Sequence, residues 1–569
     1  MERVIMTEYE KWHSMKLDDP DLTEELNAIE GNAGEINDRF YRELEFGTGG
    51  LRGVIGAGTN RINIYTVRKA TQGLANYLNK KTSHASVAIA YDSRIKSDVF
   101  AKAAAEVLAA NGITAHLYPQ LMPTPALSFA VRHLKCDAGI CITASHNPAK
   151  YNGYKAYGSD GCQVALEMAD AILDEINRLD IFRDVKHMDY DAAVEQGSIQ
   201  AIGEDVVTAF LNAVKSQSIL DCSDSDLKVV YTPLNGSGKM CVTRIFDMIG
   251  IKDVTIVPEQ SDPDGNFPTC PYPNPEFREA LQVGLDLCKS VQPDLLVATD
   301  PDCDRMGIAV RHNGDYQLLN GNEVGVLLLD FIARNRIASG TMPNHPVAVK
   351  TIVSTDLTDS VAKEYGIELR SVLTGFKYIG DQIAGLEANG EESRYIFGFE
   401  ESYGYLSGSY VRDKDAVNAS MLVCEMAVDY KKQGKTLVDA IHDIYEKHGY
   451  FLNELMNFTF EGQDGMNKMQ SIMEQLRTNT PTNIAGFAVV GWSDYKASKC
   501  FDGTIETDIA LPKSNVLEYR LENGSKLIVR PSGTEPKLKL YLSAKGKTRD
   551  ESQAVIQAFK NCANELLGI

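Results

Sequence analysis

Short runs of apolar and β-branched residues alternate with stretches of helical spacing over most of the chain. The run at 86–94 reads SVAIAYDSR, and it is followed by a helical stretch at 99–112 and a second run at 113–118. Apolar runs of this length indicate buried strands, whereas Ala and Leu at helical spacing indicate a covering helix. Gly112 suits the end of that helix, because glycine tolerates a positive φ. The segment therefore predicts a parallel sheet covered by helices.

The same rhythm returns further along the chain. The strand-like runs that repeat it are at 227–233, 254–258, 293–300 and 347–353, the last followed by a helical stretch at 357–365. The C-terminal part differs, because strands at 487–492, 526–530 and 537–542 precede a closing helix at about 550–567. These patterns predict repeated α/β units followed by a smaller α+β domain.

The chain is too long to fold around one hydrophobic core. At 569 residues it should form several domains, since domains rarely exceed about 250–300 residues. We place the boundaries near residues 205, 322 and 446. The predicted domains are 1–205, 206–322, 323–446 and 447–569.

Composition narrows the class of protein. A 44% hydrophobic and 24% charged composition is ordinary for a globular protein, and the net charge of -21 would repel the phosphates of nucleic acid. The N-terminus lacks the apolar core of a signal peptide, and no apolar run reaches the ~18 residues that a membrane span needs. We therefore expect a cytoplasmic protein with no nucleic-acid or membrane partner. If it binds an anionic substrate, it must gather cations locally or hold a metal ion.

A serine follows a buried-looking strand in the segment CITASHNPAKYNGYKAYG at 141–158. Ser145 is flanked by His146, Asn147 and Pro148, which favour a rigid turn. A serine hydroxyl needs a base or a metal to become a good nucleophile, and His146 and Lys155 are the nearby candidates for proton transfer. Such Ser-His pairs are more often ordinary turn residues, so this segment alone decides nothing.

Three aspartates alternate at the end of the strand at 293–300. Asp300, Asp302 and Asp304 can converge on one hard cation, because carboxylate oxygens are its preferred ligands. An EF-hand loop is excluded, since its sixth and twelfth positions would be Arg305 and Arg311. Three carboxylates leave coordination positions for water or phosphate, which suits Mg²⁺. A solvated acidic turn remains the alternative for this motif taken alone.

Two further segments offer polar groups beside glycines. In FGFEESYGY, at 397–405, Glu400 and Ser402 suit the hydroxyls of a sugar, although a structural role is equally consistent with the pattern. In VRPSGTEPKLKLY, at 529–541, the tight turn of Arg530, Ser532, Gly533 and Thr534 predicts an anion cradle. The segment NGSGKM at 235–240 lacks the glycine and hydroxyl positions of a phosphate-binding P-loop, so we reject nucleotide binding there.

Together these segments resemble the α-D-phosphohexomutase superfamily, and within it the longer phosphoglucomutase and phosphomannomutase branch. The motifs that carry the resemblance stand in the family's order: FGTGGLRG (46–53), TASHNP (143–148), DPDCDR (300–305), GFEESYG (398–404) and RPSGTEP (530–536). The likeness runs from about Phe46 to Tyr541. It implies an α/β protein of four domains around a central cleft, three related α/β domains with mixed sheets and a smaller C-terminal phosphate-binding α+β domain.

The resemblance also assigns roles to residues. Ser145 looks like a phosphoserine that donates and recovers the phosphoryl group and, with Asp300, Asp302 and Asp304, binds Mg²⁺. By similarity, Arg52, His146 and Lys155 surround the transferring phosphate, and Arg305 is a further cation of the cleft. The remaining implied substrate-binding residues are Thr374, Gly375, Glu400, Ser402 and Lys414 for the sugar, and Arg530, Ser532, Gly533 and Thr534 for the other phosphate.

The implied activity is interconversion of glucose 1-phosphate and glucose 6-phosphate, with glucose 1,6-bisphosphate as intermediate and activator. Within the same chemistry, the alternatives are a phosphomannomutase, a phosphopentomutase or a glucose 1,6-bisphosphate synthase. A serine phosphatase or hydrolase is more distant, because no G-x-S-x-G motif surrounds Ser145. Hexose phosphates are the expected small-molecule partners, and the sequence leaves a monomer and a weak dimer equally open.

Overall fold

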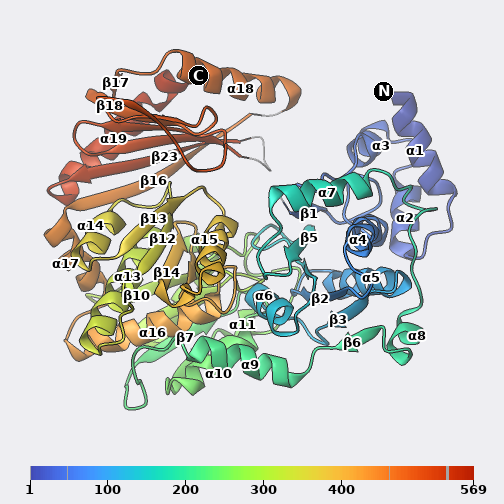
Figure 1. Ribbon diagram of the computed structural model, residues 1–569, viewed down its shortest axis with the longest axis horizontal. Coiled ribbons are helices and arrows are strands. Elements are labelled where there is room, and N and C mark those ends of the chain that lie inside the picture. The colour runs from blue at the N-terminus through green and yellow to red at the C-terminus, as the bar shows by residue number, and fades with distance from the viewer. Residues whose placement is uncertain (1, 48, 461, 533–536) are drawn as a thin grey trace. The chain divides into compact units, whose positions relative to one another are not determined.

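The computed structural model describes residues 2–47, 49–460, 462–532 and 537–569, and these residues form two compact units. The first unit extends to Asn320 and also contains Ile379–Tyr395 and Ser402–Gln433. The second unit contains Gly321–Tyr378, Ile396–Glu401 and Gly434–Ile569. Figure 1 colours the chain by residue number and labels many of these elements.

The first unit begins with helices that pack through aromatic side chains. They are α1 (Glu2–Ser14), α2 (Pro20–Ala28) and α3 (Ala33–Phe40). Trp12 is fully buried and makes edge-on contacts with Phe40, Tyr65 and Phe182. Edge-to-face pairs of this kind stabilise a core beyond the burial of apolar area, so Trp12 anchors the N-terminal helices on the α/β region that follows.

The first sheet has the strand order β1-β5-β4-β2-β3-β6. Strands β2, β3, β4 and β6 are parallel, whereas β5 runs antiparallel to both β4 and β1. The strands are β1 (Gly50–Val54), β2 (Ser86–Tyr91), β3 (Thr114–Leu117), β4 (Ala138–Ile142), β5 (Tyr151–Gly158) and β6 (Ile199–Ala201). The helices of this region are α4 (Ile64–Asn79), α5 (Ser97–Ala110), α6 (Thr124–His133), α7 (Leu166–Ile176), α8 (Tyr190–Glu195) and α9 (Glu204–Lys215).

The second sheet repeats this plan with the order β11-β10-β9-β7-β8. Strands β7, β8 and β9 are parallel, and β10 and β11 are added antiparallel. Its strands are β7 (Lys228–Thr232), β8 (Asp253–Ile256), β9 (Leu295–Thr299), β10 (Met306–His312) and β11 (Asp315–Leu319). Its helices are α10 (Lys239–Met248), α11 (Pro258–Ser261) and α12 (Arg278–Val291). Three later elements also belong to the first unit: most of α15 (Phe376–Ala388), β15 (Gly404–Leu406) and α16 (Ala416–Lys432).

The second unit contains another α/β region and the C-terminal domain. The first of these has strands β12 (Val347–Thr351), β13 (Glu368–Val372) and β14 (Tyr395–Glu400), with helices α13 (Gly321–Ala338), α14 (Leu357–Glu364) and α17 (Leu437–His448) and the short 3₁₀ helix Glu392–Arg394. Strands β12 and β13 are parallel. Helices α13, α14 and α17 pack against one another.

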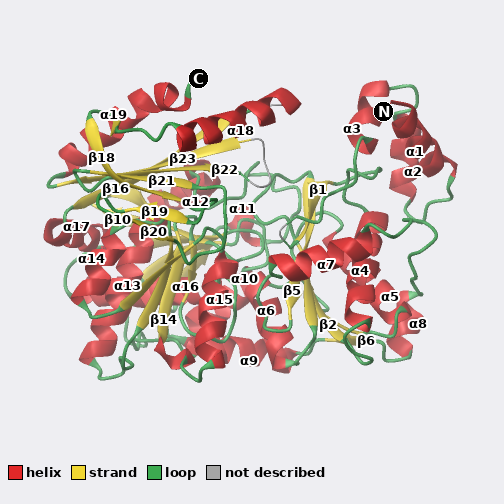
Figure 2. Ribbon diagram, turned by 45° about the horizontal axis from the view of Figure 1, so that its top comes forward, coloured by secondary structure: helices red, strands yellow, loops and turns green. Residues whose placement is uncertain are grey.

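The C-terminal sheet of the second unit has the order β16-β23-β22-β21-β18-β19-β20, and β17 pairs with β18. Its strands are β16 (Tyr450–Thr459), β17 (Asn483–Ile484), β18 (Phe487–Asp494), β19 (Lys499–Phe501), β20 (Glu506–Asp508), β21 (Leu517–Leu521), β22 (Lys526–Pro531) and β23 (Lys537–Gly546). Helices α18 (Gly462–Thr478) and α19 (Arg549–Leu567) lie beside this sheet in Figure 2.

Alternating side chains on the C-terminal sheet build two separate cores. Leu527 and Val529 join the core under α18 and α19, whereas Ile528 points to the other face and packs with Ile352 and Leu373. Such alternation follows from the two-residue period of a strand. The second core joins the C-terminal domain to the α/β region of the same unit. Lys526 strengthens this junction, since its Nζ lies 2.7 Å from a carboxylate oxygen of Asp356.

The α/β class with mixed sheets and a C-terminal α+β region is confirmed, and so are the strands predicted from apolar runs. The rhythm predicted only parallel strands, but β5 and β10 run antiparallel to the strands beside them, and β1 and β11 pair antiparallel with β5 and β10 at the edge of each sheet. The boundaries near 205, 322 and 446 stay a prediction. Among the described residues, no helix has both the length and the apolar character needed to cross a membrane.

Two helix glycines give a matched test of the packing in each unit. A Cβ at Gly325 of α13 would lie 2.3 Å from a ring carbon of Phe399, whereas a Cβ at Gly385 of α15 would meet nothing within 4 Å. Gly325→Ala should destabilise the fold by about 1–3 kcal/mol through overpacking. Gly385→Ala should stabilise it by about 0.5–1 kcal/mol, because alanine restricts the unfolded chain. Thermal unfolding of both variants checks this, and equal shifts would contradict the packing described.

Candidate functional site

Segments from two sheets of the first unit meet around Ser145. Ser145 follows β4 and Asp300 follows β9, and both strands are buried along their whole length. The carboxyl ends of parallel strands are where open α/β sheets place their ligands. The two segments are in direct contact, because the Ser145 Oγ donates a hydrogen bond of 3.1 Å to Asp300 Oδ2. The structure therefore brings together the serine and the aspartates that the sequence singled out.

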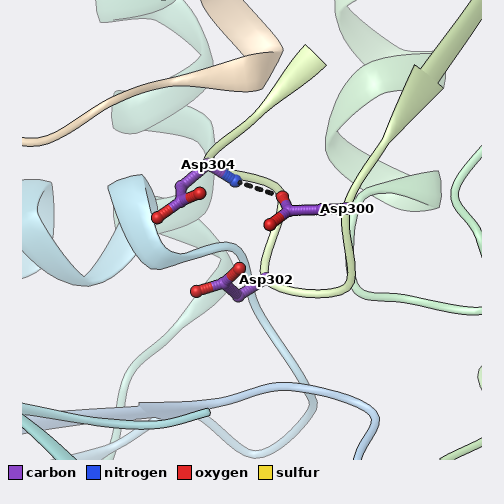
Figure 3. A group of neighbouring side chains, drawn as sticks. All are labelled: Asp300, Asp302 and Asp304. Carbon is purple, nitrogen blue, oxygen red and sulfur yellow. Dashed lines mark hydrogen bonds between the residues drawn. The ribbon is translucent and has the colours of Figure 1, made fainter. Parts of the chain in front are cut away.

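The three aspartates form one buried acidic cluster (Figure 3). Asp300, Asp302 and Asp304 are at most 2% exposed, and one carboxylate oxygen of each lies within 4.8 Å of the others. The Asp300 side chain also shapes its own loop, since Oδ1 accepts hydrogen bonds from the backbone amides of Asp304 and Arg305 at 3.1 and 3.0 Å. The loop thus holds its carboxylates in a fixed arrangement that faces Ser145.

Two lysines compensate the charge of this cluster. Lys155 Nζ lies 2.8 Å from Asp302 Oδ2 and 3.5 Å from Asp304 Oδ2, and Lys414 Nζ lies 3.3 Å from the same Asp304 oxygen. Burial opposes the charge of Lys155, but the neighbouring aspartates outweigh it and raise the pKa of its ammonium above the ordinary value. Lys155 is therefore a cation in this site rather than a base.

Burial and neighbouring charges also shift the pKa values of Asp300 and Asp302, in opposite directions. Burial and the charges of Asp302 and Asp304 raise the pKa of Asp300 well above its usual range. Burial acts in the same direction on Asp302, but Lys155 and the hydroxyl of Thr124 more than offset it and lower the pKa of that carboxyl. Thr124 Oγ1 donates to Asp302 Oδ2 at 2.9 Å. Like charges held this close resist joint ionisation unless a cation joins them.

The donor set of this cluster fits a divalent cation. Asp302 Oδ1 and Asp304 Oδ1 are buried and have no hydrogen-bond partner among the described residues. A buried carboxylate oxygen without a partner is costly, so such atoms are usually found bonded to a donor or to a metal. All the ligand atoms are hard oxygens, the kind that Mg²⁺ prefers. The site can therefore hold one metal ion beside the Ser145 hydroxyl.

Ser145 has an unusual backbone conformation. Its φ is 53°, in the left-handed region that non-glycine residues rarely adopt. Its amide donates to Thr143 Oγ1 at 2.8 Å, and its Oγ lies 3.1 Å from His146 Nδ1 as well as from Asp300. Burial, and then the charges of Arg305 and Arg52, lower the pKa of His146 well below its usual value. The imidazole is thus neutral and can exchange a proton with the serine hydroxyl.

Two arginines predicted for the site lie in the same unit. Arg52 on β1 is exposed, and its Nη1 donates to Asn147 Oδ1 of the serine turn at 3.2 Å. Arg305 Nη1 donates to Glu276 Oε1 at 2.9 Å and to the backbone oxygen of Ser402 at 3.1 Å. Ser402 is therefore tied to the aspartate loop through Arg305.

The remaining predicted residues belong to the second unit. Glu400 ends β14 and is 4% exposed, and its Oε1 accepts a hydrogen bond of 2.7 Å from the amide of Gly375. Thr374 Oγ1 is buried without a hydrogen-bond partner in the described part of the chain. The structure thus brings Thr374, Gly375 and Glu400 together on one loop system.

Arg530 lies at the end of β22, where its Nη1 is 3.4 Å from the hydroxyl of Tyr541. Burial, and then the charge of Glu401, raise the pKa of Tyr541, and both Arg530 and Glu400 also act on it. Tyr541 therefore links the predicted cradle to the loop of Glu400 within the second unit. Ser532 directly follows β22, and its amide donates to the Lys537 oxygen at 2.8 Å. The predicted residues Gly533 and Thr534 lie outside the described residues.

Two residues of the site escaped the sequence analysis. Thr124 contacts Asp302 through both its hydroxyl and its amide, and Glu276 pairs with Arg305. Thr124 begins α6 in the segment MPTP (122–125), and Glu276 lies in the segment PYPNPEF (271–277). Both proline-rich segments resemble ordinary loop sequence. Their partners are far away in the chain, so only the tertiary structure reveals them.

Profiles of known protein families match most of the chain. Profiles described as phosphoglucomutase/phosphomannomutase alpha/beta/alpha domains I, II and III match residues 43–181, 208–314 and 320–448. The profile of the phosphoglucomutase/phosphomannomutase C-terminal domain matches residues 459–558. The four matches follow one another in the order of the domain names.

Curated relatives are similar over nearly their full length. A phosphoglucomutase of Staphylococcus saprophyticus is 39% identical over 536 residues, which cover 93% of this chain and 95% of the relative. A phosphoglucomutase of Staphylococcus aureus is 39% identical over 531 residues, covering 92% and 94% respectively. The similarity therefore extends over almost the whole of both chains.

Solved structures share the fold at lower identity. Parafusin, a phosphoglucomutase from Paramecium, superposes with a TM-score of 0.68 at 17% identity, over 93% of this chain and 96% of its own. A phosphoglucomutase/phosphomannomutase family protein from Burkholderia thailandensis gives a TM-score of 0.66 at 18% identity, over 92% and 97%. At such identities the likeness concerns the fold alone.

Metal binding to the acidic cluster can be measured without any substrate. Asp302→Asn removes one negative charge and one ligand, so the affinity for Mn²⁺, followed by electron paramagnetic resonance of the free ion, should fall at least ~10-fold. Asp294→Asn is the matched control, because Asp294 stands at the opposite end of β9 and pairs with Lys431. Equal affinities of the two variants would contradict a metal site at the cluster.

Proposed function

We propose that this chain, which belongs to the phosphoglucomutase/phosphomannomutase family, interconverts glucose 1-phosphate and glucose 6-phosphate through a phosphorylated Ser145. The contact of the Ser145 hydroxyl with Asp300 is the observation that carries the proposal, because it joins a nucleophile to a metal-binding cluster. Relatives at 39% identity that carry the name phosphoglucomutase support glucose as the sugar.

Asp300, Asp302 and Asp304 would hold Mg²⁺ together with an oxygen on Ser145. When bound, Mg²⁺ neutralises charge on the phosphoryl oxygens as it develops. Phosphoryl transfer has a loose transition state, so the chain contributes mainly positioning and electrostatics. Lys155 and Arg52 supply further positive charge beside the serine turn, and Arg305 orients the backbone of Ser402.

The reaction consists of two transfers. In the first, the oxygen of a free sugar hydroxyl forms a bond to the phosphorus of phosphoserine, while the bond from phosphorus to Ser145 Oγ breaks. The hydroxyl proton leaves the sugar, and one proton returns to Ser145 Oγ. His146 is placed to hold that proton, since its Nδ1 lies 3.1 Å from Oγ. The product is glucose 1,6-bisphosphate, whose other phosphate returns to the serine in the second transfer.

Both orientations of the bisphosphate must be bound by the same residues. We assign the phosphate that does not react to Arg530, Ser532, Gly533 and Thr534, and the sugar hydroxyls to Glu400 and Ser402. Thr374, Gly375 and Lys414 are the further residues that we assign to sugar binding. Binding energy from the distant phosphate can then hold either hydroxyl in line with the serine. The contact of Arg530 with Tyr541 supports this assignment, because it fixes the guanidinium.

Ser145→Ala should abolish turnover, with kcat reduced at least ~10⁴-fold, because no other group can carry the phosphoryl group. The fold should persist, which circular dichroism and the melting temperature check. Conversion of glucose 1-phosphate is followed with Mg²⁺ and a trace of glucose 1,6-bisphosphate. Substantial turnover in a folded variant would exclude the phosphoserine mechanism.

Arg530→Ala should raise KM for glucose 1-phosphate by about 10-fold or more, since a charged hydrogen bond to phosphate is lost. The rate at which Ser145 is phosphorylated by saturating glucose 1,6-bisphosphate should change much less. Lys545→Ala is the control, because Lys545 is exposed on the neighbouring strand β23. Unchanged KM in the Arg530 variant would remove the cradle from the proposal.

Matched rates on glucose 1-phosphate and mannose 1-phosphate, each with and without a chelator, decide the sugar. Faster metal-dependent turnover of glucose 1-phosphate is expected. A preference for mannose 1-phosphate or for a pentose phosphate would reassign the substrate and leave the mechanism in place. Net release of glucose 1,6-bisphosphate or of free phosphate would instead favour a synthase or a hydrolase.

A further inference from the structure

A buried arginine lies directly beneath the turn that carries Ser145. Arg94 follows β2 and is 3% exposed. Its Nη2 donates to the backbone oxygen of Ser145 at 2.5 Å and to that of Asn147. Its Nη1 donates to the backbone oxygens of Pro148 and Tyr151 at 3.0 and 2.9 Å. One guanidinium therefore binds four carbonyls of the segment from Ser145 to Tyr151.

The turn needs such a partner because its conformation is strained. Ser145 is held at a φ of 53°, which disfavours any residue with a side chain unless the surroundings fix it. Within the turn itself, the amide of Ser145 donates to Thr143 Oγ1, and the amides of Asn147 and Tyr151 donate to the oxygens of Ala144 and Pro148 at 3.2 and 3.0 Å. The bonds from Arg94 therefore carry much of the constraint on where the Ser145 Oγ points.

Arg94 is itself fixed from two directions. Asp92 Oδ2 lies 3.4 Å from its Nε, and Asp92 Oδ1 accepts hydrogen bonds from the Arg94 amide and from Ser97 Oγ at 2.9 and 2.8 Å. On the other side, the ring of Phe267 lies 5.1 Å from the guanidinium carbon. A cation over an aromatic face is attracted to it, most strongly when water is excluded.

The segment that carries Phe267 packs closely on the backbone around Arg94. A Cβ at Gly265 would lie 2.5 Å from the amide nitrogen of Ile95, so only glycine permits this approach. Phe267 also has a positive φ of 46°. Since this segment lies between α11 and α12 of the second sheet region, Arg94 connects the serine turn to the sheet that bears Asp300.

We propose that Arg94, supported by Asp92 and Phe267, is a positioning residue that holds the Ser145 turn in line for phosphoryl transfer. The inference rests on the proposed function for its kinetic consequence. Arginine suits this role because its planar fork offers five donors, whereas a lysine offers one point charge and cannot bind four carbonyls at once. Because Arg94 is buried and its Nη1 and Nη2 donate to the backbone of the turn, its loss should lower kcat and leave KM nearly unchanged.

The variant to test is Arg94→Lys, which retains the positive charge. A displacement of about 1 Å at a reacting group lowers rates ~100-fold, so we expect kcat to fall by that order while KM changes less than ~3-fold. The rate at which glucose 1,6-bisphosphate phosphorylates Ser145, followed by the intact mass of the protein, should fall in parallel. Amide hydrogen exchange in a peptide covering 143–151 should accelerate, because the turn loses its fixed partner.

Arg68→Lys is the matched control. Arg68 on α4 is also buried, with its side chain 10% exposed, and its ion pairs are with Asp18 and Glu106 rather than with the serine turn. This variant should keep kcat and the exchange of 143–151 at the wild-type level. If Arg94→Lys behaves like Arg68→Lys in both readouts, or lowers kcat without any change in exchange, the positioning role is wrong.

Phe267→Leu keeps the proposal testable if Arg94→Lys does not fold. Leucine retains an apolar contact but removes the aromatic face, so kcat should fall by roughly 3- to 10-fold with KM unchanged. Unchanged kcat in this variant would overturn the support assigned to Phe267 and Arg94. A wild-type protein that takes up no phosphate would contradict the proposed function instead, and the exchange of 143–151 would still decide whether Arg94 holds the turn.

Discussion

Three carboxylates are buried on one loop of the first unit, and their negative charge has to be compensated by the surrounding structure. Asp300, Asp302 and Asp304 are almost fully enclosed, and each ion removed from water costs several kcal/mol unless it is paired. Lys155 comes from β5 and Lys414 from the segment that precedes α16, so two distant parts of the chain converge on the same carboxylates. The antiparallel strand β5 and the return of α16 to this unit thus both bring a lysine to the charge of one loop.

The turn that carries Ser145 is likewise held in place by polar contacts. Ser145 has a positive φ and contacts Asp300, and four backbone carbonyls of the turn accept hydrogen bonds from Arg94. The nucleophile therefore has little conformational freedom. A preorganised site of this kind avoids reorganisation during the reaction, which is where electrostatic catalysis gains most. The positive φ of Ser145 is sustained because Arg94, itself held by Asp92 and Phe267, binds the backbone of the turn.

The sequence predicted the parts of the fold that rest on local pattern. The strands β2, β7, β9 and β12 coincide with apolar runs, and the aspartates were recognised because they directly follow such a run. Strand β5 was not predicted, since YNGYKAYG mixes glycines, tyrosines and a lysine without regular alternation. Arg94 also ends an apolar run, in the segment SVAIAYDSR, so the rule that ligands gather at the carboxyl ends of strands could have singled it out. The sequence did not reveal its role, because its partners are backbone carbonyls about fifty residues away. Backbone groups are the same in every residue, so a pattern of side chains does not identify them.

The central claim is that Ser145 gives its phosphoryl group to the sugar beside the acidic cluster. The most direct measurement mixes purified, phosphorylated protein with an excess of unlabelled glucose 1-phosphate and Mg²⁺, quenches within one turnover, and follows both the peptide that contains Ser145 and the sugar products by mass spectrometry. We predict that this peptide loses one phosphoryl group at the rate at which glucose 1,6-bisphosphate appears, and that a chelator stops both. Bisphosphate formed while the Ser145 peptide keeps its mass, or phosphate released to water instead, would contradict the account.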